Sequence, residues 1–236
     1  MDRWTHGVHS HRVAEIVDSI VDLVLGRACA GCDAPGSLVC PACALTLKPQ
    51  PRSRKALDLA DVQAGLRVPV ACAVDYRGPV RRMLYRYKDH RMRQLVGAFA
   101  PVLASAVVFS ANQAGLALER TLLVPMPTRR QSLRRRGFDA TDLLVGRALR
   151  YVPAAGSARL LVDTRRQGSV KTLGAGEREL RAVDAFSVRP SKRLPTGPVI
   201  LIDDVITTGS TVKEAVATLL LAGVHVAAVA TAAGTP

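Results

Sequence analysis

The sequence predicts a mixed α/β protein, with a parallel sheet covered by helices on both faces and a small four-cysteine module before it. Two observations support this prediction. Residues 199–202 form an apolar run that leads, through a turn of small residues, into a helical pattern over 212–220 and a second apolar run over 225–231. A strand–helix–strand unit of this kind gives parallel strands with a right-handed crossover. Upstream, four cysteines stand in two closely spaced pairs within residues 29–43.

The composition is that of a folded, basic protein. The 236 residues are enough for one ordinary domain and a small module, and 48% of them are apolar, which excludes global disorder. Aromatic residues make up only 4%, which argues against a nucleic-acid binder that stacks bases on aromatic side chains. The net charge of +14 fits a polyanionic partner, either a phosphorylated ligand or nucleic acid, and equally a soluble protein with a basic surface.

The first residues show neither a secretory signal nor a membrane span. Residues 1–12 are polar, and the apolar run over 16–25 is interrupted by Asp18 and Asp22. Such a run is too short and too charged to cross a bilayer. We therefore expect a cytoplasmic protein without a membrane span.

The four cysteines predict a structural zinc site. Cys29 and Cys32 form one CxxC step, and Cys40 and Cys43 form another shortly after it. In a cytoplasmic chain, paired CxxC steps are typical of tetrahedral Zn²⁺ coordination rather than of disulfides. A thioredoxin-like redox pair is the alternative, although one CxxC would be enough for it and no strand precedes the motif. Cys72 is expected to be a buried strand residue without chemistry.

The module and the main domain are expected to follow one another along the chain. Residues 1–48 would hold an N-terminal amphipathic helix, with apolar residues over 13–24 on one face, and the zinc-binding module. Residues 49–69 mix prolines with scattered charge and are predicted to form a linker. Residues 70–236 would form the main domain, whose first strand covers about residues 70–76.

Two adjacent acids, Asp203 and Asp204, follow the apolar run of the last strand–helix–strand unit. They could merely end a strand, form a Walker-B pair, or bind ribose hydroxyls. A Walker-B pair requires a GxxxxGK[ST] loop, and the sequence contains none. Residues 207–211 instead combine hydroxyls, a glycine and a helix start, which is typical of a phosphate-binding loop. Carboxylates beside such a loop suit a sugar phosphate, with Mg²⁺ to offset the charge.

Other segments offer further contacts for a phosphorylated ligand. A predicted strand over 121–124 ends in the turn Pro125-Met126-Pro127, whose fixed backbone could contact a pyrophosphate. The arginines within 129–136 could form a phosphate clamp, a nucleic-acid patch or a solvated loop. Lys88, at the end of a helical pattern, is expected to face the ligand crevice. The polar, glycine-containing stretch 163–181 is interpreted as a lid over the site.

The thirteen residues Val199–Thr211 resemble the 5-phosphoribosyl-1-pyrophosphate (PRPP) signature of type I phosphoribosyltransferases. Over nearly the whole chain the sequence is similar, more narrowly, to the ComF family of ComFC-like proteins. Besides that signature, the shared features are the helix and cysteines over 13–43, Tyr76, Gly78 and Lys88, the turn Val124–Pro127, and Arg136–Phe138. The chain departs from the family pattern at Val170, Arg181 and Asp139-Ala140. These differences bear on the identity of the acceptor and on turnover, and they leave the phosphate loop unchanged.

The resemblance implies a type I phosphoribosyltransferase fold and a role for each residue of the site. Asp203 and Asp204 would be the catalytic residues and would hold the ribose 2′- and 3′-hydroxyls. Mg²⁺ would bind together with PRPP. The residues that would bind PRPP and its phosphates are Thr207, Thr208, Gly209, Ser210, Thr211, Pro125, Met126, Lys88 and Arg136.

Two functions are therefore predicted. The first is Mg²⁺-dependent binding of PRPP, or of another ribose 5-phosphate, by a phosphoribosyltransferase of unidentified acceptor. The second is a non-catalytic accessory role in DNA uptake and competence, a process to which ComF relatives are linked. In that case the basic segments 77–93 and 129–136 would contact single-stranded DNA or the uptake machinery.

Overall fold

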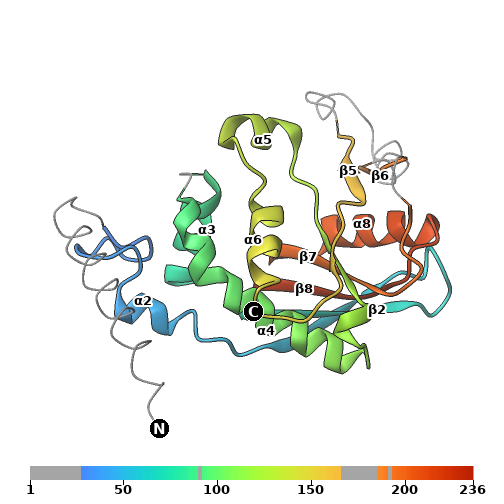
Figure 1. The fold of residues 1–236 in the computed structure, drawn as a ribbon, viewed down its shortest axis with the longest axis horizontal. Coiled ribbons are helices and arrows are strands. Elements are labelled where there is room, and N and C mark those ends of the chain that lie inside the picture. Colours follow the sequence, from blue (N-terminus) through green and yellow to red (C-terminus); the bar gives the residue numbers. More distant parts are fainter. Residues whose placement is uncertain (1–27, 90–91, 166–184, 191–192, 236) are drawn as a thin grey trace, which may run out of the picture.

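The computed structural model describes residues 28–89, 92–165, 185–190 and 193–235, and its main feature is a six-stranded sheet in the order β1-β2-β8-β7-β3-β4 (Figure 1). In this order, each strand from β2 through β8, β7 and β3 to β4 runs parallel to its neighbour, and β1 pairs with β2 in the antiparallel direction. In sheet order the strands are β1 (Arg52–Asp58), β2 (Arg67–Asp75), β8 (Val226–Gly234), β7 (Val199–Ile206), β3 (Leu122–Pro125) and β4 (Gly156–Ser157).

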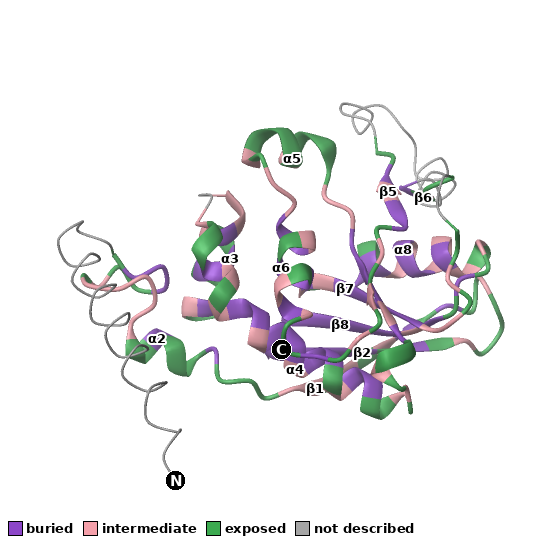
Figure 2. Cartoon of the chain, viewed as in Figure 1, coloured by how far each residue is buried: buried purple, intermediate pink, exposed green. Residues whose placement is uncertain are grey.

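Helices cover both faces of this sheet. Successive side chains of a strand point to opposite faces, and in β7 Ile200 and Ile202 join one apolar cluster while Val199 and Leu201 join the other. The first cluster includes side chains from α3 (Gly78–Asp89), α4 (Val96–Gln113) and α6 (Ala140–Ala148), and the second includes side chains from α8 (Ser210–Leu221). The central strands are accordingly buried (Figure 2). The predicted fold class is confirmed.

Smaller elements connect these layers. The helical ones are α2 (Pro41–Leu45) in the cysteine module, η1 (Arg93–Leu95) before α4, η2 (Leu118–Arg120) before β3, and α5 (Arg130–Arg136) after β3. Strands β5 (Leu161–Asp163) and β6 (Phe186–Val188) form a separate antiparallel pair. Phe186 belongs to the same apolar cluster as α8, so this pair lies on the α8 side of the sheet.

The segment 49–69, expected to be a linker, contains strand β1. Arg54 lies opposite Val70 of β2, so this segment is part of the sheet. Most residues of β1 are polar or charged, as is common in edge strands that must not pair with other molecules. The predicted N-terminal helix over 13–24 lies outside the described residues, as does most of the predicted lid.

One helical stretch of the described chain passes a simple test for a membrane span. Residues Arg93–Gln113 reach a mean hydropathy of 1.8 in their most apolar window, but 56% of that window is buried inside the protein. Phe99 and Leu103 of this stretch are fully buried in the core beneath the sheet. A core helix passes the same test, so this stretch is weak evidence for a membrane span.

Candidate active site

The acidic pair lies within strand β7, near its C-terminal end. The apolar run ends at Ile202, but β7 continues to Ile206, and Asp203 is paired with Thr231 of β8. Because neighbouring strand residues point to opposite faces, the two acids differ in environment. Asp204 is buried and Asp203 is half-buried. The pair therefore belongs to the sheet itself and is held more rigidly than a loop would allow.

Lys88 forms an ion pair with the buried acid. Its Nζ lies 2.6 Å from Oδ2 of Asp204, and the Asp204 side chain is only 2% exposed. This oxygen has no well-directed hydrogen bond in the described part of the chain, so the ammonium charge is its main compensation. Lys88 stands in the last turn of α3 beside Tyr87, whose buried hydroxyl donates a 2.7 Å hydrogen bond to the Ala140 carbonyl of α6. Helix packing thus places the lysine at the acids.

The ion pair separates the proton affinities of the two acids. Burial would raise the pKa of Asp204, but the positive charge of the nearby Lys88 ammonium outweighs burial and leaves this pKa below its ordinary value. Burial, together with the charge of Asp204, raises the pKa of Asp203 well above its ordinary value. The site therefore holds one stably ionised carboxylate and one carboxyl that takes up a proton more readily.

The predicted phosphate loop connects β7 to α8. Gly209 adopts a left-handed conformation with φ 82° and caps the N-terminal end of α8. The Thr208 and Ser210 hydroxyl oxygens lie 3.2 Å apart. All four hydroxyl side chains of the loop are exposed: Thr207, Thr208, Ser210 and Thr211. Hydroxyls and amides at the positive end of a helix dipole are the donors that an anion requires.

The turn Pro125-Met126-Pro127 lies beside the acids. Pro125 is paired with Ile202 across β3 and β7, and the Met126 N–H donates a 2.8 Å hydrogen bond to the Ile202 carbonyl. Proline has no N–H, and the Met126 amide is already engaged. Backbone N–H contacts from these two residues to a pyrophosphate are therefore not available in this conformation. The sequence could not show this because it depends on how the two strands pair.

Arg136 is the most buried of the arginines expected to form a clamp. It ends α5, its side chain is 13% exposed, and one guanidinium nitrogen lies 3.7 Å from Asp89 Oδ1. Asp89 directly follows Lys88 in the last turn of α3, so this ion pair places Arg136 at the end of the helix that carries Lys88. Its Nε is buried without a hydrogen-bond partner among the described residues. Arg136 is thus placed to meet an anion near Lys88.

Three residues outside the set predicted to bind the ligand support this arrangement. Asp89 forms ion pairs with Arg135 and Arg136, which hold α5 against α3. Phe138 packs edge-on against Tyr87, with ring centroids 6.0 Å apart. Asp139 caps α6 by accepting a hydrogen bond from the Asp142 N–H. Each had a sequence signal: Asp89 follows Lys88 at the expected helix end, Phe138 lies in the motif Arg136–Phe138, and an aspartate just before a helical pattern is a typical N-cap.

The cysteine module forms a compact cluster of four thiols. The Sγ atoms of Cys29, Cys32, Cys40 and Cys43 all lie within 4.8 Å of one another. Four sulfurs around a tetrahedral zinc at about 2.3 Å would be roughly 3.8 Å apart, so this donor set fits such a metal. A Cβ atom on Gly31 would lie 2.6 Å from the Cys43 Sγ, so glycine is needed for this close approach. The four cysteines are positioned to bind a metal ion.

The module already favours one thiolate and is attached to helix α3. Burial would raise the pKa of Cys29, but hydrogen bonds from the Cys40 and Gly31 N–H groups lower it to about 6. Arg86 of α3 donates a 3.0 Å hydrogen bond to the Cys29 carbonyl and a 2.6 Å hydrogen bond to Asp33. The helix that carries Lys88 therefore also holds the cysteine module.

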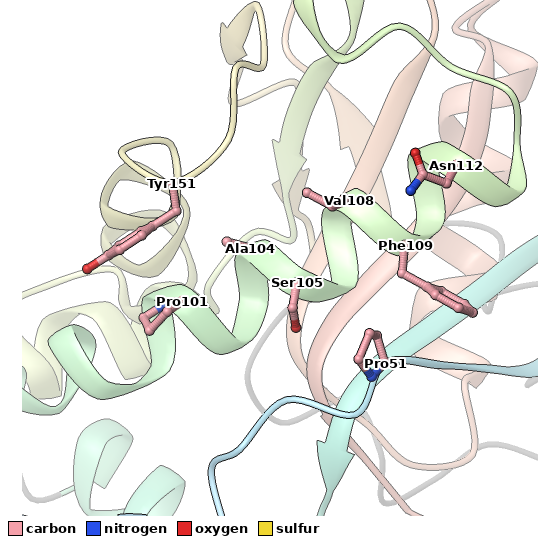
Figure 3. A pocket seen from close by; sticks show the side chains of 8 residues that line it. All are labelled: Pro51, Pro101, Ala104, Ser105, Val108, Phe109, Asn112 and Tyr151. Atoms are coloured by element: carbon pink, nitrogen blue, oxygen red, sulfur yellow. The ribbon is translucent and has the colours of Figure 1, made fainter.

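A pocket of about 470 Å³ lies away from these residues, along the outer side of α4 (Figure 3). Pro51, Ala104, Phe109 and Tyr151 line part of it, and the acidic pair and the loop do not contribute. The side chains labelled in Figure 3 carry no charged group. This pocket therefore offers no counter-charge to a phosphorylated ligand.

Comparison with known proteins supports the resemblance predicted from the sequence. No family model matches the chain. It is 32% identical over 149 residues to the DNA utilization protein YhgH of Salmonella typhi, covering 62% of this chain and 63% of that protein. It is 31% identical to YhgH of Escherichia coli K12 over 150 residues, with the same coverages of 62% and 63%. Competence protein F of Haemophilus influenzae is 29% identical over 140 residues, covering 59% of this chain and 61% of that protein.

The chain is a homologue of these proteins. The matches span slightly less than two thirds of their length. The resemblance to ComF-like proteins is therefore confirmed. Among solved structures, orotate phosphoribosyltransferase from Aeropyrum pernix is similar with a TM-score of 0.34 and 16% identity, covering 77% of this chain and 87% of that one. A likeness this weak supports no conclusion about activity.

Replacing Lys88 tests the ion pair. Lys88→Met leaves the Asp204 carboxylate buried without its counter-charge, which typically destabilises a protein by about 3–5 kcal/mol. We expect urea unfolding at neutral pH to show a loss of this size. As the matched control, Lys213→Met breaks an exposed ion pair with Asp61 and should cost at most about 1 kcal/mol.

The loss should also depend on pH. The lowered pKa of Asp204 gives the wild type a stability that is present above the unfolded-state pKa of about 4 and disappears as pH falls through the folded-state pKa. The difference between the wild type and Lys88→Met should therefore be largest at neutral pH and shrink on acidification. A difference that is independent of pH, or no larger than that of Lys213→Met, would contradict the role given to this ion pair.

Proposed function

We propose that this protein binds PRPP, or another ribose 5-phosphate, together with Mg²⁺, and acts as a phosphoribosyltransferase on an acceptor still to be identified. The main supporting observation is the arrangement at the end of β7, where the ion-paired Asp204 and the half-buried Asp203 are followed within a few residues by an exposed hydroxyl loop. Ligands of open α/β sheets bind at the carboxyl ends of the strands. Carboxylates and an anion loop at that edge suit a ligand with both hydroxyls and phosphates.

Different residues of the site would hold different parts of such a ligand. Asp203 and Asp204 would accept hydrogen bonds from the ribose hydroxyls, and the loop 207–211 would donate to the 5-phosphate. Lys88 and Arg136 would neutralise the charge of the departing pyrophosphate, which Mg²⁺ would also offset when bound. Positioning and charge neutralisation of this kind would stabilise an oxocarbenium-like transition state at the ribose C1.

Calorimetric titration with PRPP and Mg²⁺ tests this proposal. We expect saturable binding by the wild type and its loss in Asp203→Asn/Asp204→Asn, which removes both carboxylates. Gly209→Val should also abolish binding, because valine is strained at φ 82° and its Cβ would approach Leu57 Cδ2 to 3.3 Å. Asp142→Asn is the control: it removes a carboxylate that is paired with Arg159 and lies outside the acidic pair, so this variant should bind PRPP normally.

Thermal melts of each variant show whether the loss reflects binding or unfolding. If the folded wild type does not bind PRPP, the proposed function is wrong. If Gly209→Val binds PRPP normally, the loop does not hold the phosphate.

We further propose that the four cysteines hold a structural zinc ion, in a reducing compartment that keeps the thiols free. Metal analysis should find about one zinc per chain. Serine at Cys29, Cys32, Cys40 or Cys43 should release it, because each contributes one sulfur to the cluster. Cys72→Ser is the matched control, since Cys72 is buried in β2 and outside the cluster. Purified protein with four titratable thiols and no metal would contradict this site.

A nucleic-acid role is the second candidate, and the names of the relatives, a DNA utilization protein and a competence protein, favour it. The structure narrows the basic surface that could serve it, because several arginines of the segments 77–93 and 129–136 are paired with carboxylates, as Arg86 is with Asp33. Within the described ranges, the exposed arginines of these two segments without a carboxylate partner are Arg81, Arg93, Arg130 and Arg134. Of these, Arg93 packs over the Phe138 ring.

Binding of single-stranded DNA, measured over a range of salt concentrations, tests this candidate. Arg130→Gln/Arg134→Gln should weaken binding and flatten the dependence of log affinity on log salt by about one unit for each phosphate that the protein no longer neutralises. Arg159→Gln is the control, because this arginine is paired with Asp142 on another helix. An unchanged slope in the double variant would place any DNA contact elsewhere.

A further inference from the structure

We propose that Arg54, on the antiparallel edge strand β1, is a further phosphate-binding residue that makes the site selective for ligands with a terminal 5-phosphate. This inference rests on the proposed function, because it concerns the same loop. It brings into the site a strand from the segment that was expected to be a linker.

Strand β1 approaches the loop at two points. An Nη atom of Arg54 donates to the Thr235 hydroxyl over 3.4 Å, and that hydroxyl donates to the Thr207 carbonyl over 3.3 Å. A short chain of hydrogen bonds therefore joins the guanidinium to the first residue of the loop. Leu57 of the same strand lies 3.3 Å from the position that a Cβ on Gly209 would occupy. Arg54 is thus held beside the loop and not merely exposed near it.

The backbone makes room for this side chain. A Cβ on Gly234 would lie 2.8 Å from Nη1 of Arg54 and 3.1 Å from its Cδ. Gly234 is not among the residues with positive φ, so what matters here is its missing side chain and not its backbone conformation. The pairing of β1 with β2 is irregular between Arg54 and Leu57, and such irregularities commonly redirect a side chain.

The charge of Arg54 lacks a partner within the described residues. Arg52, two positions earlier in the same strand, is paired with Asp75, whereas no described carboxylate lies within ion-pair distance of Arg54. Arg54 is half-buried and stands near the loop that begins α8, where the helix dipole is also positive. An anion bound between these two positive features would be stabilised by both. A phosphate dianion is such an anion, and arginine can bind two of its oxygens at once.

The position of Arg54 also determines which part of the ligand it contacts. Lys88 lies at the acids and Arg136 pairs with the next residue, Asp89, on the side of the ligand where pyrophosphate would leave, whereas Arg54 lies at Thr207 and Thr235 on the loop side. Arg54 should therefore contribute to the affinity for ribose 5-phosphate and PRPP, and not to the affinity for pyrophosphate. This difference separates a specific contact from a general loss of positive charge.

Titration of the full-length protein with ribose 5-phosphate, and separately with Mg²⁺ and pyrophosphate, tests the proposal. Arg54→Met should weaken ribose 5-phosphate binding about tenfold or more, the range expected when a hydrogen bond to a charged group is removed, and leave pyrophosphate binding unchanged. Lys55→Met is the matched control: it removes the same charge from the next, exposed residue of β1 and should change neither the ribose 5-phosphate affinity nor the pyrophosphate affinity. Thermal melts confirm that each variant is folded.

A second variant reaches Arg54 indirectly. Gly234→Ala should weaken ribose 5-phosphate binding because its methyl group displaces the guanidinium, and it should have no further effect when combined with Arg54→Met. If the wild type binds ribose 5-phosphate but Arg54→Met behaves like Lys55→Met, this inference is overturned and the proposed function stands. Equal losses for both ligands in Arg54→Met would overturn the selectivity. If the wild type binds neither ligand, the proposed function fails and this inference fails with it.

Discussion

The ion pair between Lys88 and Asp204 is the interaction on which the rest of the site depends. It joins the last turn of α3 to the centre of the sheet and compensates a carboxylate that is almost completely buried. A buried charge without such a partner would be costly, so the position of α3 and the presence of the acid in β7 require one another. Because Lys88 keeps Asp204 ionised, the neighbouring Asp203 is left as the carboxyl that more readily takes up a proton.

Helix α3 connects two parts of the molecule that the sequence presents separately. Arg86 on this helix holds the cysteine module through Cys29 and Asp33, and Lys88 holds the acidic pair. Tyr87 between them fixes the helix against α6. The four-cysteine cluster is therefore connected to the candidate active site through a single helix, although none of its cysteines belongs to that site. A metal ion held by these cysteines would stabilise the module that α3 contacts.

Much of the fold and of the loop could be predicted because short-range patterns encode them. The run Val199–Ile202 is apolar throughout because both of its faces are buried. Gly209 marks the start of α8 because its backbone at φ 82° is in the left-handed region, which glycine adopts without strain. The edge strand β1 was missed because its mostly polar and charged residues resemble a connection when the neighbouring strand is not known.

The sequence by itself determined the α/β class, the paired acids, the hydroxyl loop and the cluster of four cysteines, since each of these depends on residues close together in the chain. Only the tertiary structure decided which side chains and backbone groups from distant parts of the chain come into contact. Lys88 reaches Asp204, Met126 is engaged by Ile202, and Arg54 reaches Thr235. The physical reason is that these contacts depend on strand register and helix packing between distant segments, and no local pattern of residue types specifies either.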